Sequence, residues 1–211
     1  MKKGIIFDMD GTLWDSAAQV AESWNVVLEK EYPEVLVRIT KEDMYRVMGK
    51  TMDVIADILF PAEEKEKRGK ILADCGKYEI QYLKEHGGML YPKVEETFKK
   101  LKEEYDLYIV SNCQKGYIEA FLDYYHLGSY IKDTECYGNT NLKKGDNIKI
   151  LAERNQLEEA VYVGDIEGDY LASKEAGIKF IHAAYGFGTI ADKVPEIAAF
   201  SELPEVVKTV L

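Results

Sequence analysis

Short runs of consecutive apolar residues recur along the chain and are typical of strands buried on both faces. Four such runs cover residues 4–7, 107–110, 160–163 and 179–183, and a weaker fifth covers residues 132–137. Strands that are apolar on both faces are characteristic of parallel sheets, because helices cover each side of such a sheet. The runs therefore predict a parallel sheet.

Helical patterns fill the intervals between the later runs. Apolar residues recur at helical spacing in segments near 94–101 and 118–125, and further helices are expected over about 146–154 and 168–176. Gly177 follows the last of these segments as a helix C-cap signal. Strands that alternate with helices predict an α/β fold with a Rossmann-like core and helices on both faces of the sheet.

One long interval breaks this alternation. Almost 100 residues separate the first run from the second, and residues 16–87 show helical patterns only. Thr40 with Asp43 forms an N-cap pattern inside this interval. We therefore expect a small all-helical cap domain over 16–87, inserted into a catalytic core made of 1–15 and 88–211. The hinges are expected near 14–16 and 86–92.

The composition is that of an ordinary globular protein with an excess of acidic residues. The 211 residues include 27 Lys and Arg and 38 Asp and Glu, so the formal net charge is −11. This charge opposes binding to nucleic acid or to an anionic membrane surface. No apolar run approaches the length of a membrane helix, and the three cysteines form no metal-binding or disulfide pattern. A cytoplasmic protein is expected.

Polar residues capable of chemistry follow the predicted strands. Ligands of an open parallel sheet bind beyond the carboxyl ends of its strands, so these residues are expected at one rim. Four carboxylates there would repel one another at neutral pH, and a divalent cation would neutralise them. Oxygen ligands favour Mg²⁺. The residues are Asp8 and Asp10 after the first run, Ser111 and Asn112 after the second, Lys143 and Lys144 before a helix, and Asp165 and Asp169 after the fourth.

These residues carry a resemblance to a known family. The segment Asp8-Met9-Asp10-Gly11-Thr12-Leu13 resembles the D-x-D-G-T-L motif of haloacid dehalogenase-like hydrolases, and Ser111, Lys144 and the segment from Gly164 to Asp169 match its other three motifs. The inserted helices resemble the cap of the family's phosphoglycolate phosphatase, β-phosphoglucomutase and phosphonoacetaldehyde hydrolase branches. Lys144 is followed by glycine where many relatives have proline, so Lys143 stays an alternative for the third motif.

The resemblance implies a role for each residue of the rim. Asp8 would be the nucleophile that forms an aspartyl-phosphate, and Asp10 would be the general acid and base. Mg²⁺ would be held by Asp8, by the backbone carbonyl of Asp10, by Asp165, and by Asp169 directly or through water. The phosphate would be bound by Gly11, Thr12, Ser111, Asn112 and Lys144.

The resemblance also implies an activity and a place where the substrate is read. A Mg²⁺-dependent phosphatase acting on a small phosphorylated metabolite is expected, and a monomer would suffice. A sugar phosphomutase remains the near alternative, and a non-catalytic receiver-like signalling domain the distant one. Arg46, Gly49 and Lys50 lie on a cap segment similar to a substrate-specificity loop, although solvated charges at a helix–helix turn explain Arg46 and Lys50 equally well. Gly186 and Gly188 form a lone G-x-G, too weak for a dinucleotide site.

Overall fold

A six-stranded parallel sheet forms the core of the computed structural model, which describes residues 2–211. Its strand order is β5-β4-β1-β6-β7-β8, and every neighbouring pair is parallel. All five predicted strands are confirmed, whereas β8 was missed because two residues give no periodicity. The strands are β1 (Lys3–Phe7), β4 (Asp106–Ser111), β5 (Ile131–Cys136), β6 (Glu159–Gly164), β7 (Lys179–Ala183) and β8 (Glu196–Ile197).

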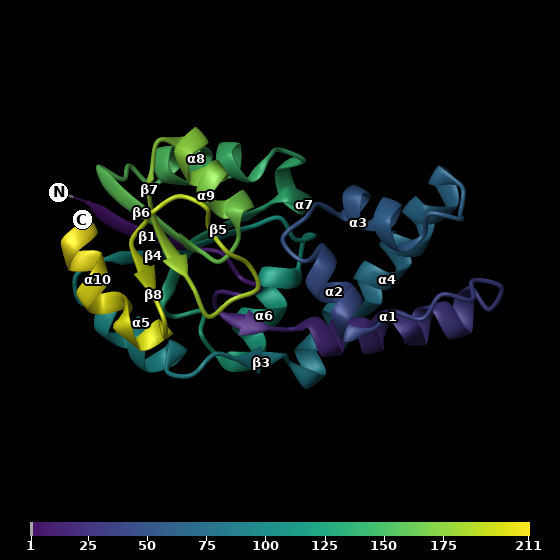
Figure 1. The fold of residues 1–211 in the computed structure, drawn as a ribbon. Helices are drawn as coiled ribbons and strands as arrows, with labels where there is room; N and C mark the ends of the chain where they lie inside the picture. The colour runs from purple at the N-terminus through teal and green to yellow at the C-terminus, as the bar shows by residue number, and fades with distance from the viewer. Residues whose placement is uncertain (1) are drawn as a thin grey trace.

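Helices cover both faces of this sheet (Figure 1). Successive residues of a strand point to opposite faces, so Ile5 and Phe7 pack on one side and Ile6 on the other. The first side carries α5 (Val94–Leu101), η1 (Phe200–Glu202) and α10 (Leu203–Val210). The second carries α8 (Lys144–Arg154) and α9 (Glu167–Ala176), while the short α7 (Tyr137–Thr140) follows β5. The α/β prediction is confirmed. Because helices pack on both faces of the sheet, its strands carry apolar residues on both faces.

Along the chain, four helices follow β1 and precede the other strands of the sheet. In space they project to one side of the sheet (Figure 1). We call them the cap: α1 (Ala17–Glu31), α2 (Lys41–Val47), α3 (Met52–Leu59) and α4 (Lys65–His86). The capping box of Thr40 and Asp43 starts α2 as predicted. The core helix α6 (Tyr117–Tyr125) packs against α4. Among residues 2–211, no helix is both long and apolar enough to cross a membrane.

The two connections between core and cap run side by side as a short antiparallel ribbon. Strand β2 (Trp14–Asp15) leads into the cap and pairs with β3 (Met89–Leu90), which leads out of it. The Trp14 ring packs edge-on against Tyr117 and Phe121, with ring centroids 5.5 and 5.0 Å away. The ribbon lies in both predicted hinge segments. The predicted boundaries at 15/16 and 87/88 stay a prediction of how the chain divides into domains.

Candidate active site

The loop after β1 begins at the point where the strand order reverses direction. Strand β1 lies between β4 and β6, and Asp8 follows it directly. The loop turns at once, because the Leu13 N–H donates to the Met9 carbonyl over 2.8 Å. Gly11 has φ +85°, and a Cβ there would lie 2.0 Å from Oδ2 of Asp165. Only glycine allows the loop to approach that carboxylate so closely.

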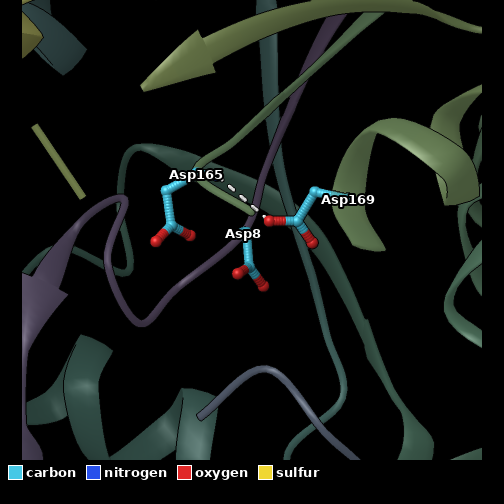
Figure 2. Close-up of side chains that lie close together, drawn as sticks. All are labelled: Asp8, Asp165 and Asp169. Atoms are coloured by element: carbon cyan, nitrogen blue, oxygen red, sulfur yellow. Dashed lines mark hydrogen bonds between the residues drawn. The ribbon is translucent and has the colours of Figure 1, made fainter. Parts of the chain in front are cut away.

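Three carboxylates from two strand ends meet beyond the sheet (Figure 2). Oxygen atoms of Asp8, Asp165 and Asp169 lie within 4.8 Å of one another, and all three residues are buried. The ammonium group of Lys144 donates to Oδ1 of Asp8 over 2.9 Å and to Oδ1 of Asp169 over 2.6 Å. Lys144 is only 5 % exposed, whereas Lys143 lies on the surface. The structure therefore places Lys144, rather than its neighbour, in the site.

The two carboxylates after β6 have different surroundings. Oδ2 of Asp169 accepts the backbone N–H groups of Asp165 and Ile166, over 3.1 and 3.2 Å, while Oδ1 accepts from Lys144. Asp165 accepts the Phe187 N–H over 2.7 Å. Both oxygens of Asp169 thus have protein donors, so this residue holds the loop and the lysine in place. The Asp8 and Asp165 carboxylates keep more acceptor capacity.

Electrostatics show that the site lacks positive charge. Burial, reinforced by the nearby carboxylate of Asp169, raises the pKa of Asp8 and of Asp165, although Lys144 opposes both shifts. Burial alone would lower the pKa of Lys144, but Asp169 and Asp8 raise it above its usual range. One ammonium group therefore faces three buried carboxylates. A divalent cation that prefers oxygen ligands would supply the missing charge, so these residues fit Mg²⁺.

Asp10 lies two residues beyond Asp8 but has different partners. Its Oδ1 accepts hydrogen bonds from the Ser16 hydroxyl over 2.8 Å and from the Tyr117 hydroxyl over 2.7 Å. Burial raises the pKa of Asp10 to about 6, and these two hydrogen bonds oppose the rise. Such a group gains and loses a proton near neutral pH, as a general acid and base requires. The Asp10 carboxylate is not in the three-carboxylate group. The family resemblance implies that its backbone carbonyl, rather than its side chain, would bind the metal.

The residues predicted to bind phosphate surround the same rim. Thr12 is buried, and its hydroxyl lies 3.5 Å from Oδ1 of Asp165. Ser111 is buried at the carboxyl end of β4. Asn112 extends toward the cap, where its Nδ2 donates to the Gly49 carbonyl over 2.8 Å. These positions bring the hydroxyl, amide and lysine groups to the side of the sheet that carries Asp8. Their phosphate-binding roles stay predictions.

The cap segment singled out from the sequence divides into two parts. Gly49 and Lys50 line a cavity together with Asp10 and Ser111. A Cβ on Gly49, which has φ +81°, would lie 2.5 Å from Cδ1 of Ile166 in the core. Arg46 instead lies on the exposed face of α2, pairs with Asp43 of the same helix, and is not among the residues that line this cavity. Its predicted role in substrate recognition stays untested.

Several contacts of the site were not anticipated. The Ser16 and Tyr117 hydroxyl groups donate to Asp10, and neither residue was among the predicted site residues. Gly186 lies against Asp165, because a Cβ there would come within 2.3 Å of the Asp165 Cβ. The G-x-G that failed as a nucleotide motif thus lets the Phe187 N–H reach this carboxylate. Two glycines within five residues of the end of strand β7 were the available signal.

Comparisons with known proteins agree with this geometry. The model of the family described as haloacid dehalogenase-like hydrolase matches residues 5–183. A phosphoglycolate phosphatase of Vibrio parahaemolyticus is 27% identical, with 97% of this chain and 96% of the relative aligned. A crystal structure described as a predicted phosphoglycolate phosphatase from Haemophilus somnus has a TM-score of 0.81 at 21% identity, covering 98% of each chain.

The fold is shared more widely than these two proteins. A β-phosphoglucomutase from Clostridium difficile has a TM-score of 0.78 at 14% identity, with 100% of this chain and 99% of that one covered. At such identity the likeness shows the fold alone. The family match, however, spans the sheet from β1 to β7 and all four motifs on its rim. The chain therefore belongs to the haloacid dehalogenase-like hydrolases, as its motifs predict.

Proposed function

We propose that this protein is a Mg²⁺-dependent phosphatase that hydrolyses a small phosphorylated metabolite through a phosphorylated Asp8. The observation that carries the proposal is the buried Lys144, which joins Asp8 to Asp169 beside Asp165. The Lys144 ammonium group stabilises negative charge on Oδ1, one of the two carboxylate oxygens of Asp8. It also adds a positive charge where the phosphate oxygens would lie. The name of the Vibrio relative supports a phosphate ester as substrate.

In the first half of the reaction, a carboxylate oxygen of Asp8 attacks the phosphorus atom. The bond between phosphorus and the ester oxygen breaks, and Asp10 donates its proton to that oxygen, so the leaving group departs as an alcohol. Tyr117 and Ser16 keep the Asp10 carboxyl group oriented for this transfer. Because the phosphoryl group carries several charges, catalysis depends mainly on position and on electrostatic stabilisation.

In the second half, Asp10 is ionised and acts as a base. It removes a proton from a water molecule, which attacks the phosphorus of phosphorylated Asp8, and the bond from phosphorus to the Asp8 oxygen breaks. Inorganic phosphate leaves, while Asp8 returns as a carboxylate and Asp10 as the protonated acid. A pKa of Asp10 of about 6 suits both of its roles.

The metal would be held by Asp8 and Asp165, by the Asp10 backbone carbonyl, and by Asp169 directly or through water. When bound, Mg²⁺ supplies positive charge that offsets the repulsion between phosphate and carboxylates. Lys144 and the backbone N–H groups of Asp165 and Ile166 donate to Asp169 and so fix its carboxylate beside the metal position. Ser111 would donate a hydrogen bond to a phosphoryl oxygen from the β4 side.

Release of inorganic phosphate from p-nitrophenyl phosphate and acetyl phosphate tests the proposal. Hydrolysis is expected with MgCl₂ and not with excess EDTA, and Asp8→Asn is expected to lose roughly 10⁴-fold or more of the rate. Asp146→Asn, the same change at an exposed position of α8, should be unaffected. Full activity in Asp8→Asn would contradict the nucleophile assignment. Isomerisation of glucose 1-phosphate without phosphate release would instead indicate a phosphomutase.

A further inference from the structure

A cavity between the cap and the core adjoins the rim of the sheet that carries Asp8, Asp165, Asp169 and Lys144, which we call the catalytic rim. It holds about 460 Å³ of empty space, counting the part open to solvent, and Asp10 and Ser111 form its core side. Apolar cap side chains form most of its other wall. They include Val20, Trp24, Met44, Val47, Met52 and Ile55.

One carboxylate interrupts this apolar wall. Glu79 lies on the cap helix α4, is only 3 % exposed, and lines the cavity. Its Oε2 accepts from the indole N–H of Trp24 over 2.5 Å, and its Oε1 accepts from the Gln114 amide over 2.9 Å. Both donors are neutral. A carboxylate has about four acceptor positions, so Glu79 can still accept a hydrogen bond from a molecule in the cavity.

A second acceptor belongs to the core side of the same cavity. The Asn112 amide is oriented by its Nδ2, which donates to the Gly49 carbonyl over 2.8 Å. Its Oδ1 is buried, and no donor within residues 2–211 reaches it. A buried acceptor without a partner costs free energy. A ligand that brings a donor would remove this cost, and Asn112 is among the lining residues.

The charges around the cavity disfavour an anionic leaving group. Asp10 and Glu79 both line it, and among the described lining residues Lys50 is the one cation, with its side chain largely in solvent. A carboxylate on the substrate would meet the buried Glu79 and the acceptor Oδ1 of Asn112, with no buried basic group among the described lining residues. Hydroxyl and ammonium groups would instead find acceptors ready to bind them.

We propose that Glu79 and Asn112 select substrates whose alcohol part carries hydrogen-bond donors and no negative charge, and that they reject carboxylate-bearing esters such as phosphoglycolate. The inference rests on the proposed phosphatase function. It separates this chain from the activity named for its phosphoglycolate phosphatase relatives. Glu79 is the specificity-determining residue, since it contacts the alcohol part rather than the phosphoryl group.

A series of esters of similar size and different end group provides the test. With Mg²⁺, kcat/KM is measured for 2-hydroxyethyl phosphate and O-phosphoethanolamine, which end in donors, and for 2-phosphoglycolate, which ends in a carboxylate. Glycerol 1-phosphate and 3-phosphoglycerate repeat the contrast with one more carbon atom. The donor-bearing esters are expected to be better substrates by roughly 100-fold, because a site built from buried acceptors discriminates strongly. Comparing 2-hydroxyethyl phosphate with O-phosphoethanolamine shows whether a hydroxyl or an ammonium donor is preferred.

Measured at pH 8, where Glu79 is ionised, Glu79→Gln is expected to reduce this preference by about 10-fold or more, because it removes the negative charge at nearly constant size. Inhibition by inorganic phosphate should not change, since the phosphoryl site is untouched; a purely structural defect would move both measurements. Glu66→Gln, the same change at an exposed position of α4, is the matched control. Equal or better turnover of phosphoglycolate by the wild type, or an unchanged preference in Glu79→Gln, would overturn the proposal.

The two proposals fail in different ways. If no ester, p-nitrophenyl phosphate included, is hydrolysed with Mg²⁺, the phosphatase function is wrong. Binding then still tests the cavity, because Asp8→Asn protein can be titrated calorimetrically with the same five esters. Tighter binding of the donor-bearing esters would support the role of Glu79, and tighter binding of the carboxylates would refute it, whatever the reaction.

Discussion

The catalytic rim and the cap cavity both bury carboxylates, but they stabilise them differently. At the rim, Asp8, Asp165 and Asp169 share one buried ammonium group, that of Lys144. In the cavity, Glu79 is held by the neutral N–H groups of Trp24 and Gln114. The rim is therefore short of positive charge and suited to a cation with a phosphate, whereas the cavity is suited to an uncharged or cationic group with donors.

This difference separates two tasks that one acidic protein has to perform. The net charge of −11 would, averaged over the protein surface, repel an anionic substrate. Under the proposed function, Lys144 and Mg²⁺ would reverse that repulsion where the phosphoryl group binds. The cavity keeps the negative character and uses it to choose the rest of the molecule. Each region can be tested by removing the group that distinguishes it.

The largest effect is expected from Lys144→Ala, which removes the charge that defines the rim. Loss of the buried cation should reduce kcat by roughly 10³-fold. It should also lower the free energy of unfolding at pH 7 by about 3–5 kcal/mol, because buried carboxylates lose their partner. Denaturant unfolding and phosphate release measure the two effects. The adjacent Lys143→Ala, at an exposed position, should change neither; equal effects of both variants would break the assignment of Lys144.

A smaller effect is expected from the pH dependence of stability at Glu79. Burial raises the pKa of Glu79 from 4.5 to about 7. Between these values the folded protein holds a proton that the unfolded chain releases, so stability falls as pH rises through this window. Relative to Glu79→Gln, the wild type should lose roughly 3 kcal/mol of unfolding free energy from pH 4.5 to pH 7.5. Denaturant unfolding of both proteins at several pH values measures it, and a difference independent of pH would contradict the burial of this carboxylate.

The smallest effect is expected from Tyr117→Phe, which removes one of the two donors to Asp10. The rate should fall by about 10-fold or less, because Ser16 remains bonded to the carboxyl group. The lost hydrogen bond favours the ionised form, so the pKa of Asp10 should rise. The alkaline limb of the pH profile of kcat/KM should then move to higher pH. Tyr124→Phe, an exposed change on the same helix, should leave that limb in place; an equal shift there would remove the special role of Tyr117.

The sequence could predict that Asp8, Asp165, Asp169 and Lys144 lie close together, because their positions are set by local features of the chain. Their roles stay predictions. Each of these residues directly follows a strand or starts a helix, and parallel strands bring their carboxyl ends together. Asp169 is the third residue of α9, and its side chain reaches back to accept the backbone N–H groups of Asp165 and Ile166. The fold followed from the same pattern, since both faces of the strands had to be covered.

The cavity could not be predicted in this way. Glu79 lies in a helix rich in charged residues, and nothing nearby in the sequence distinguishes it from the exposed Glu66 or Glu85. Its burial depends on Trp24 and Gln114, which are distant in the chain. The two-residue strands β2 and β3 were equally invisible, because two residues carry no period. For Arg46, the sequence left a ligand-binding role and a solvated charge equally open, and the structure shows it exposed and paired with Asp43.

The ribbon formed by Trp14–Asp15 and Met89–Leu90 has a consequence for how this architecture can vary. The chain leaves the sheet domain and returns to it on neighbouring antiparallel strands, whose ends a two-residue hairpin turn could equally join. The geometry of the sheet therefore does not depend on the segment inserted between β2 and β3. Closing even a long insertion costs little additional entropy when its ends are already held together. The cap helices can therefore be lengthened, exchanged or lost while the sheet keeps its strand order.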